Sequence, residues 1–269
     1  MAGAIRVGVG GWTFPPWRGV FYPEGLRQRE ELAWASRQLT SIEINGTYYS
    51  SFKPHSWREW REATPDGFVF AVKGSRFCTN RRELAGAGEA VGRFFAQGIA
   101  ELGDRLGPVL WQLPHTKKFD AGDLAAFLTL LPRELGGRPL RHAIEPRHAS
   151  FSTPAYLDLL ARAGVANAYA RHARYPEIAD ATGEFVYARL QTGADEEPEA
   201  YAPEELDAWA ERLKAWARGE APPGLPMLGG VDDHPRDVFA FVIHEGKLRA
   251  PAGALALIRR VGAAPLAQS

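Results

Sequence analysis

The chain has 269 residues, 45% of them hydrophobic and 24% charged, and its 32 basic and 32 acidic residues give a formal net charge of zero. This is an ordinary globular composition, and the balanced charge argues against nucleic-acid coat proteins and membrane-surface proteins, which normally carry a basic excess. Its single cysteine, Cys78, excludes an intrachain disulfide and a zinc site held by a cluster of cysteines. No stretch reaches the roughly 18 apolar residues of a membrane span, and the first residues lack a signal-peptide pattern. We therefore expect a cytoplasmic protein without membrane contact.

Short β-rich runs alternate with helical stretches along the chain. The first run, "IRVGVG" at 5–10, ends in glycines, and a helix at 24–39 leads to the second run, "SIEI", at 41–44. Further strands are predicted at 67–73, 107–114, 141–148, 165–170, 184–191 and 236–244. Further helices are predicted at 55–64, 80–104, 120–132, 152–164, 203–219 and 251–262.

Eight predicted strands, nearly all followed by a helix, indicate a (β/α)8 TIM barrel. The apolar strand runs lack clean alternation, which is typical of a parallel sheet covered on both faces. An open doubly wound sheet of similar length is the alternative. No linker or repeat divides the chain, so we expect one domain over residues 1–269. The acidic segment 193–205 is expected to be a solvated loop, and 229–235 a turn before the last strand, where a metal role for Asp232 and Asp233 is disfavoured by their distance from the barrel mouth.

Polar side chains stand at the C-terminal ends of the predicted strands, where barrel enzymes carry their catalytic residues. The candidates, in chain order, are Glu43, Asn45, Lys73, Gln112, Glu145, Arg147, His148, Arg189 and His244. Glu43 is notable because it lies between two isoleucines, and a carboxylate in an apolar run requires a partner, a ligand or water. If the barrel closes, these side chains converge on one mouth, where Lys73 and Arg189 could compensate Glu43 and Glu145.

The carboxylates and cations suggest different chemistry. Glu43 and Glu145 are candidate acid and base residues, because glycoside-type hydrolysis needs two carboxylates across one bond, and His148 is an alternate. Lys73, together with Arg147 and Arg189, could bind a phosphate or carboxylate group. A desolvated Lys73 could instead be a Schiff-base nucleophile. The simpler alternative is that these cations only neutralise the two carboxylates.

Aromatic and amide side chains complete the predicted site. Trp12, Trp17 and Tyr49 could stack on a sugar or a base, or could pack the barrel rim. Asn45 and Gln112 are expected to orient the substrate. The chain has no HxH or HExxH pattern, and "VGVGG" lacks the spacing of a dinucleotide fingerprint, so no metal or cofactor is predicted.

Several of these stretches resemble the YecE-like family, also called domain of unknown function 72. The similar stretches are "VGVGGWTFPPWRGVFYP" (7–23), "IEINGTYYS" (42–50), "FVFAVKGSRFCT" (68–79), "LGPVLWQLP" (106–114), "AIEPRHASF" (143–151) and "FVYARLQTG" (185–193). They run in family order over nearly the whole chain, and the resemblance implies a TIM barrel without implying a reaction. This chain departs from the family pattern at "RLQTG", where the family has His-Gly after Arg-Leu, and at "FVIHEG", where the family has Asn-Asn-Asp. The side of the mouth made by the last two strands is therefore expected to be altered.

Together these patterns favour a cofactor-independent hydrolase or lyase that acts on a small polar, anionic or sugar-like substrate at the C-terminal mouth. A nucleic-acid-binding or processing protein is the first alternative, although zero net charge disfavours it. A non-catalytic ligand-binding protein is the second.

Overall fold

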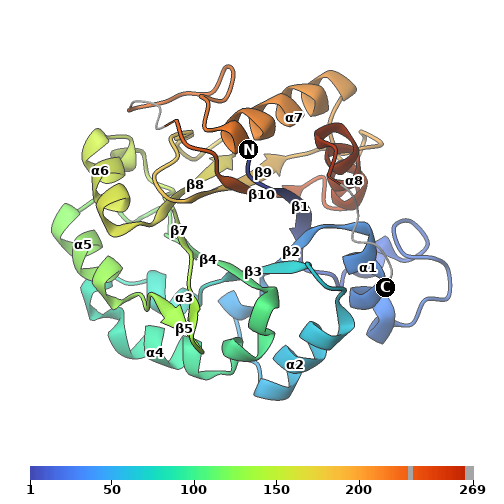
Figure 1. The fold of residues 1–269 in the computed structure, drawn as a ribbon, viewed down its shortest axis with the longest axis horizontal. Coiled ribbons are helices and arrows are strands. Elements are labelled where there is room, and N and C mark those ends of the chain that lie inside the picture. Colours follow the sequence, from blue (N-terminus) through green and yellow to red (C-terminus); the bar gives the residue numbers. More distant parts are fainter. Residues whose placement is uncertain (230–232, 264–269) are drawn as a thin grey trace.

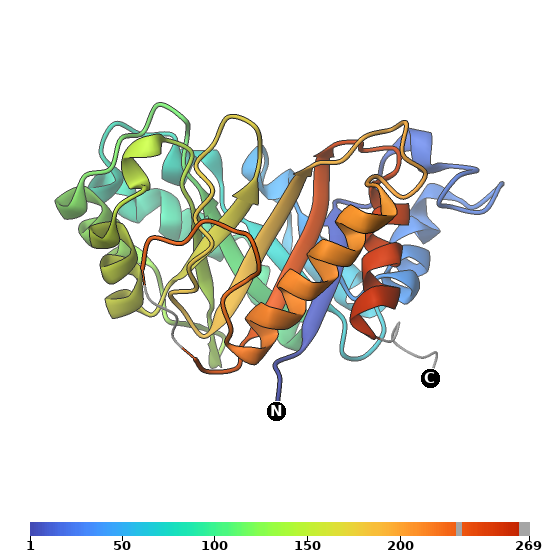
Figure 2. The same cartoon turned by 90° about the horizontal axis from the view of Figure 1, so that it is seen from above.

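The computed structural model describes residues 1–229 and 233–263, and it confirms the predicted (β/α)8 barrel. Eight parallel strands close in the order β1-β10-β9-β8-β7-β4-β3-β2, with β2 paired back onto β1 (Figure 1). The barrel strands are β1 (Ile5–Gly10), β2 (Ser41–Ile44), β3 (Val69–Lys73), β4 (Leu106–Gln112), β7 (His142–Glu145), β8 (Ala166–Arg171), β9 (Phe185–Thr192) and β10 (Asp237–Glu245). The N-terminus lies at the lower end of the barrel in Figure 2, and the strands point to the upper end.

Helices surround the barrel. They are α1 (Glu31–Gln38), α2 (Pro54–Ala63), α3 (Arg76–Thr79), α4 (Gly88–Ala96), α5 (Ala121–Leu130), α6 (Pro154–Ala163), α7 (Pro203–Arg218) and α8 (Ala250–Val261). Short 3-10 turns add to these, among them η3 (Gly46–Tyr48), η5 (Ile99–Arg105) and η6 (Ala149–Phe151). None of the helices in the described ranges is long and apolar enough to cross a membrane.

The long helical region predicted at 80–104 is divided into separate segments in the structure. Its centre is α4, and the chain then breaks at Gly98, which has a φ of 109°, before the 3-10 segment η5. Gly98 is required there because a Cβ atom would lie 2.8 Å from Cα of Pro54 at the start of α2. The break lets the chain pass close beneath α2, a long-range contact that helical periodicity does not encode.

Two other differences from the prediction are smaller. A short hairpin of β5 (Glu134–Leu135) and β6 (Arg138–Pro139) precedes β7, and the predicted helix at 24–39 begins at Glu31. The expected turn at 229–235 is described only in part, because Asp232 lies outside the described residues. Helix α6 follows the predicted pattern, with Thr153 before its first residue and Gly164 at its end with a φ of 65°.

The period of two along each strand decides which side chains enter the barrel. An apolar cluster that includes Ala71, Leu110, Ala143 and Tyr187 fills the middle of the barrel. Two residues further along the same strands come Lys73, Gln112, Glu145 and Arg189, all of which are buried. A polar layer therefore lies above the apolar one, at the C-terminal mouth.

Candidate functional site

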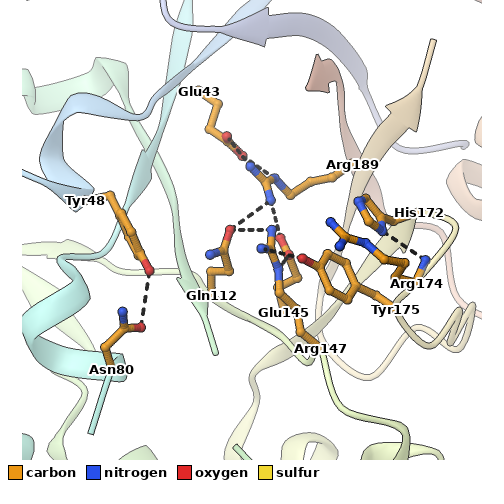
Figure 3. Close-up of polar contacts among 10 residues, drawn as sticks. All are labelled: Glu43, Tyr48, Asn80, Gln112, Glu145, Arg147, His172, Arg174, Tyr175 and Arg189. Atoms are coloured by element: carbon orange, nitrogen blue, oxygen red, sulfur yellow. Dashed lines mark hydrogen bonds and ion pairs between the residues drawn. The ribbon is translucent and has the colours of Figure 1, made fainter. Parts of the chain in front are cut away.

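Arg189 occupies the centre of the polar layer (Figure 3). Its Nε and Nη2 atoms donate to the two carboxylate oxygens of Glu43, each at 3.0 Å, and its Nη1 atom donates to Glu145. The exposed fraction of Arg189 is 4%, and both carboxylates are fully buried. One guanidinium group thus joins β2, β7 and β9 across the interior of the barrel.

A second arginine completes the network. Nε of Arg147 lies 2.6 Å from Oε1 of Glu145, and its Nη2 donates to Oε1 of Gln112 at 2.6 Å. Gln112 and Glu145 are paired in register on adjacent strands, which places their side chains side by side. The Arg147 guanidinium also lies over the ring of Tyr175, 4.5 Å from its centroid. Both arginines therefore donate to the same amide and the same carboxylate.

The carboxylates are held in their ionised forms. Burial by itself raises the pKa of Glu145, but Arg189, Arg147 and Lys73 outweigh burial and lower the pKa to about 2. Burial likewise opposes ionisation of Glu43, yet Arg189, Lys73 and a 2.7 Å hydrogen bond from the Tyr187 hydroxyl lower its pKa. Both carboxyl groups therefore carry their negative charge at neutral pH in this arrangement.

Lys73 differs from the arginines because its amine is unpaired. It ends β3, its exposed fraction is 7%, and within residues 1–229 and 233–263 Nζ has no hydrogen bond or ion pair. Nζ lies over the ring of Tyr48, 4.5 Å from the centroid. Burial and the neighbouring Arg189 outweigh the attraction of Glu43 and Glu145, so the pKa of Lys73 is lowered to about 7.

Local contacts hold the end of β3 in place. The backbone N–H of Gly74 donates to the Leu110 carbonyl at 2.8 Å, and the Thr47 hydroxyl donates to the Lys73 carbonyl. A side chain at Gly74 is excluded because its Cβ would lie 2.3 Å from the Trp111 ring. These contacts account for the fixed position of the Lys73 backbone.

Gln191 adds a second unpartnered group to the mouth. It follows Arg189 by two residues on β9 and has an exposed fraction of 1%. Its Nε2 atom is buried and has no hydrogen-bond partner in the described part of the chain. A buried donor without a partner is uncommon in folded proteins.

The predicted aromatic residues are divided between packing and exposure. Trp17 is 1% exposed and its Nε1 donates to the Lys247 carbonyl at 2.8 Å, so this ring packs the rim. Trp12 packs edge-on against Trp60 with their centroids 5.1 Å apart. The structure does not bring either ring into the network around Arg189. Tyr49, in contrast, is 63% exposed.

The remaining predicted residues lie around the network. Nδ1 of His148 accepts the backbone N–H of Ser150 at 3.1 Å, which makes His148 the cap of η6. Asn45 follows β2 and lies against Gly10, where a Cβ atom would be 2.6 Å from its Nδ2. His244 is exposed at the end of β10 and has a φ of 74°, which is rare for a residue with a side chain.

Sequence reasoning missed some neighbours of the site. Tyr187 was read only as part of an apolar strand, although its position two residues before Arg189 could have indicated the same face. His172, Arg174 and Tyr175 follow β8 in a segment that has no regular structure. Figure 3 places these three side chains beside Arg147, and only the closed barrel brings them there.

One group of residues has the composition of a metal site. The potential ligand atoms of His172, His244 and Glu245 lie within 4.8 Å of one another. However, Nδ1 of His172 accepts the Arg174 backbone N–H at 3.1 Å, so the neutral ring carries its proton on Nε2. Burial and the nearby His244, Arg147 and Arg174 lower the pKa of His172. A ring N–H beside two guanidinium groups suits an anion better than a cation.

Comparisons with family models, curated proteins and solved structures all point to the same family. The model of a family described as "Protein of unknown function DUF72" matches residues 6–268. The UPF0759 protein YecE of Escherichia coli is 31% identical over 150 residues, which cover 55% of this chain and 50% of that protein. The match thus spans about half the length of the curated relatives.

Solved structures share the fold. A DUF72 family protein from Thermotoga maritima has a TM-score of 0.70 at 23% identity, covering 94% of this chain and 96% of that one. A DUF72 family protein from Enterococcus faecalis has a TM-score of 0.70 at 17% identity, covering 97% of this chain and 98% of that one. At these identities the likeness extends to the barrel and not to an activity.

Proposed function

The chain belongs to the DUF72 family, whose function is unknown, and from this premise we propose that it is a cofactor-independent hydrolase or lyase acting on a small anionic substrate at the C-terminal mouth of the barrel. The observation that carries the proposal is the buried amine of Lys73 beside the arginine network, an amine that has no hydrogen bond or ion pair to any residue that the structure describes. A buried ammonium group without a partner is costly, so a protein retains it where a ligand supplies the missing charge.

The charge balance of the network favours an anion. Three cations, Lys73, Arg147 and Arg189, face the two carboxylates of Glu43 and Glu145, which leaves one positive charge when Lys73 is protonated. An anionic group of the substrate would balance this charge. Guanidinium groups bind carboxylate and phosphate groups through paired hydrogen bonds, and Arg147 at the edge of the network is the one best placed to do so.

The side chains divide into roles on physical grounds. Because Glu43 and Glu145 are ionised at neutral pH, they serve as bases and as charge partners. Lys73 titrates near neutrality, the range in which general acids and bases are most effective. The amide oxygen of Gln112 is taken by both arginines, so its NH2 group is the part left for a substrate. The acid and base roles of Glu43, Glu145 and His148 stay predictions.

The proposal is tested by anion binding followed by turnover. Inorganic phosphate should raise the melting temperature of the protein above that in chloride of equal ionic strength, because a ligand of the native state stabilises it by mass action. Lys73→Met and Arg147→Met should lose this increment, and Arg218→Met, an exposed residue at the far end of α7, should keep it. An equal increment in all three variants would overturn the anion site. Phosphorylated and carboxylated compounds would then be screened for conversion by mass spectrometry, with Lys73→Met as the inactive control.

A nucleic-acid ligand is the second candidate, and exposed aromatic residues favour it. Tyr49 and Phe77 are each 63% exposed, and Cζ of Arg76 lies 5.8 Å and 5.5 Å from their ring centroids. Aromatic rings with arginine suit stacked bases and their phosphates. A labelled single-stranded oligonucleotide should bind at low salt and bind more weakly to Phe77→Ala. Absence of binding at low salt would remove this candidate.

A further inference from the structure

A comparison of Lys73 with Lys117, another largely buried lysine, shows which partners the amine of Lys73 lacks among the described residues. Lys117 is also largely buried, with 11% of its side chain exposed, and its Nζ donates to the Asp123 carboxylate and to the Arg82 carbonyl. Lys73 is 7% exposed and its Nζ has neither kind of partner among the described residues. A lysine kept for stability would be expected to resemble Lys117. Because the Lys73 amine lacks such partners among the described residues, we look for a role of this amine in chemistry and not in stability.

The position of the amine suits a nucleophile. Lys73 stands at the C-terminal end of a barrel strand, and the Thr47 and Gly74 contacts hold its backbone in place. Nζ lies against the face of Tyr48. Two carboxylates and two guanidinium groups act on it electrostatically, and none of them accepts its protons through a hydrogen bond. The lone pair of a neutral amine here is consequently not engaged by a donor.

We propose that Lys73 forms a Schiff base with the carbonyl carbon of a small compound that also carries an anionic group. This inference rests on the proposed function and deepens it, because it assigns the lyase branch and names the substrate class. The lowered pKa of Lys73, about 7, agrees with it, since a substantial fraction of the amine is then neutral under physiological conditions.

The step is balanced without an oxidant or a reductant. The neutral amine attacks the carbonyl carbon, a nitrogen–carbon bond forms, and one proton moves from nitrogen to the former carbonyl oxygen. A second proton, taken from solvent, allows the carbon–oxygen bond to break and water to leave. The product is a protonated imine, whose positive charge is attracted to Glu43 and Glu145 as that of the lysine ammonium is. The iminium group then withdraws electrons from a bond at the neighbouring carbon, as a lyase requires.

The anionic group of the substrate would lie toward the arginine side of the mouth. Arg147 donates to Glu145, Tyr175 and Gln112, and 15% of its side chain remains exposed. His172, with its proton on Nε2, lies beside it. A carboxylate and a phosphate share the chemistry that these donors recognise. The experiment therefore needs one probe of each kind and an uncharged one.

Reductive trapping tests the inference on the intact chain. The protein is incubated at pH 7 with pyruvate, dihydroxyacetone phosphate or acetone, reduced with sodium borohydride and digested, and the modified lysines are identified by mass spectrometry. The chain has six lysines, so the other five are internal controls. Labelling of Lys73 should exceed that of Lys117 and of exposed Lys118 at least about tenfold, because each unit of pKa changes the neutral fraction about tenfold.

The variants separate this inference from the proposed function. Lys73→Arg keeps the positive charge, so it should lose trapping while phosphate still raises its melting temperature. Arg147→Met should lower the preference for pyruvate or dihydroxyacetone phosphate over acetone. Phosphate binding without selective trapping at Lys73 by any probe would overturn the Schiff base and leave the anion site standing. Absence of both would overturn both.

Discussion

Arg189 and Glu43 form a paired ion bridge inside the barrel, with Nε and Nη2 of the arginine each 3.0 Å from a different oxygen of the carboxylate. The two residues are 146 positions apart in the chain. The same guanidinium also binds Glu145, so one buried cation donates hydrogen bonds to two buried carboxylates.

Replacing Arg189 should lower the free energy of unfolding strongly. Arg189→Met leaves Glu43 and Glu145 buried with much of their compensation removed, and breaking a buried ion pair costs about 3–5 kcal/mol of unfolding free energy. Urea denaturation at pH 7 measures the loss. Arg218→Met, which removes an exposed pair with Glu220, is the matched control and should change little. Adding Glu43→Gln to Arg189→Met should recover part of the loss, and a double variant less stable than the single one would contradict the ion-pair account.

Lys73→Met should stabilise the protein, and most strongly at low pH. The folded-state pKa of Lys73, about 7, lies below its usual 10.5, so between these values the unfolded chain binds the proton and the native chain does not. The cost of burying the ammonium is full below pH 7 and fades toward pH 10.5. The gain in unfolding free energy at pH 6 should be on the order of a few kcal/mol and should shrink by pH 10.

The matched control for this variant is Lys117→Met, which removes a paired lysine. It should lose stability, because Asp123 is left without its cation. Denaturation of both variants at pH 6 and pH 10 distinguishes them. Equal effects of the two substitutions would show that the amine of Lys73 is paired in solution.

Acid should destabilise the protein through Glu145. Its folded-state pKa of about 2 lies below the usual 4.5, so its contribution to stability is present above pH 4.5 and is lost as the pH falls toward 2. Glu145→Gln should be less stable than the wild type at pH 7, and its unfolding free energy should fall less steeply between pH 5 and pH 3. Parallel curves for the two proteins would contradict the lowered pKa.

His244 should carry backbone strain. Its φ of 74° lies in the left-handed region, where a side chain costs about 1 kcal/mol relative to glycine. His244→Gly should therefore be more stable than His244→Ala by about this amount in the same denaturation assay. The comparison of these two variants removes the imidazole from both, so the difference reports the backbone alone. Equal stabilities would place the residue in an ordinary conformation.

Local pattern in the sequence determined the architecture and the layer in which the candidate residues lie. Hydrophobic periodicity and turn residues located the eight strands, and the step of two from Ala71 to Lys73 and from Ala143 to Glu145 follows from strand geometry alone. It did not reveal the break at Gly98, because that glycine is required by the approach of Pro54.

Tertiary structure alone decided which charges meet. From the sequence, Lys73 and Arg189 were equally good candidates as partners of the two carboxylates. The closed barrel shows that Arg189 binds both carboxylates, and that the Lys73 amine has no hydrogen bond or ion pair among the described residues. It also brought the irregular segment after β8 to Arg147. Strand periodicity specifies the face on which a side chain lies, whereas the partners on that face depend on strands distant in sequence, and pKa depends on those partners and on burial together.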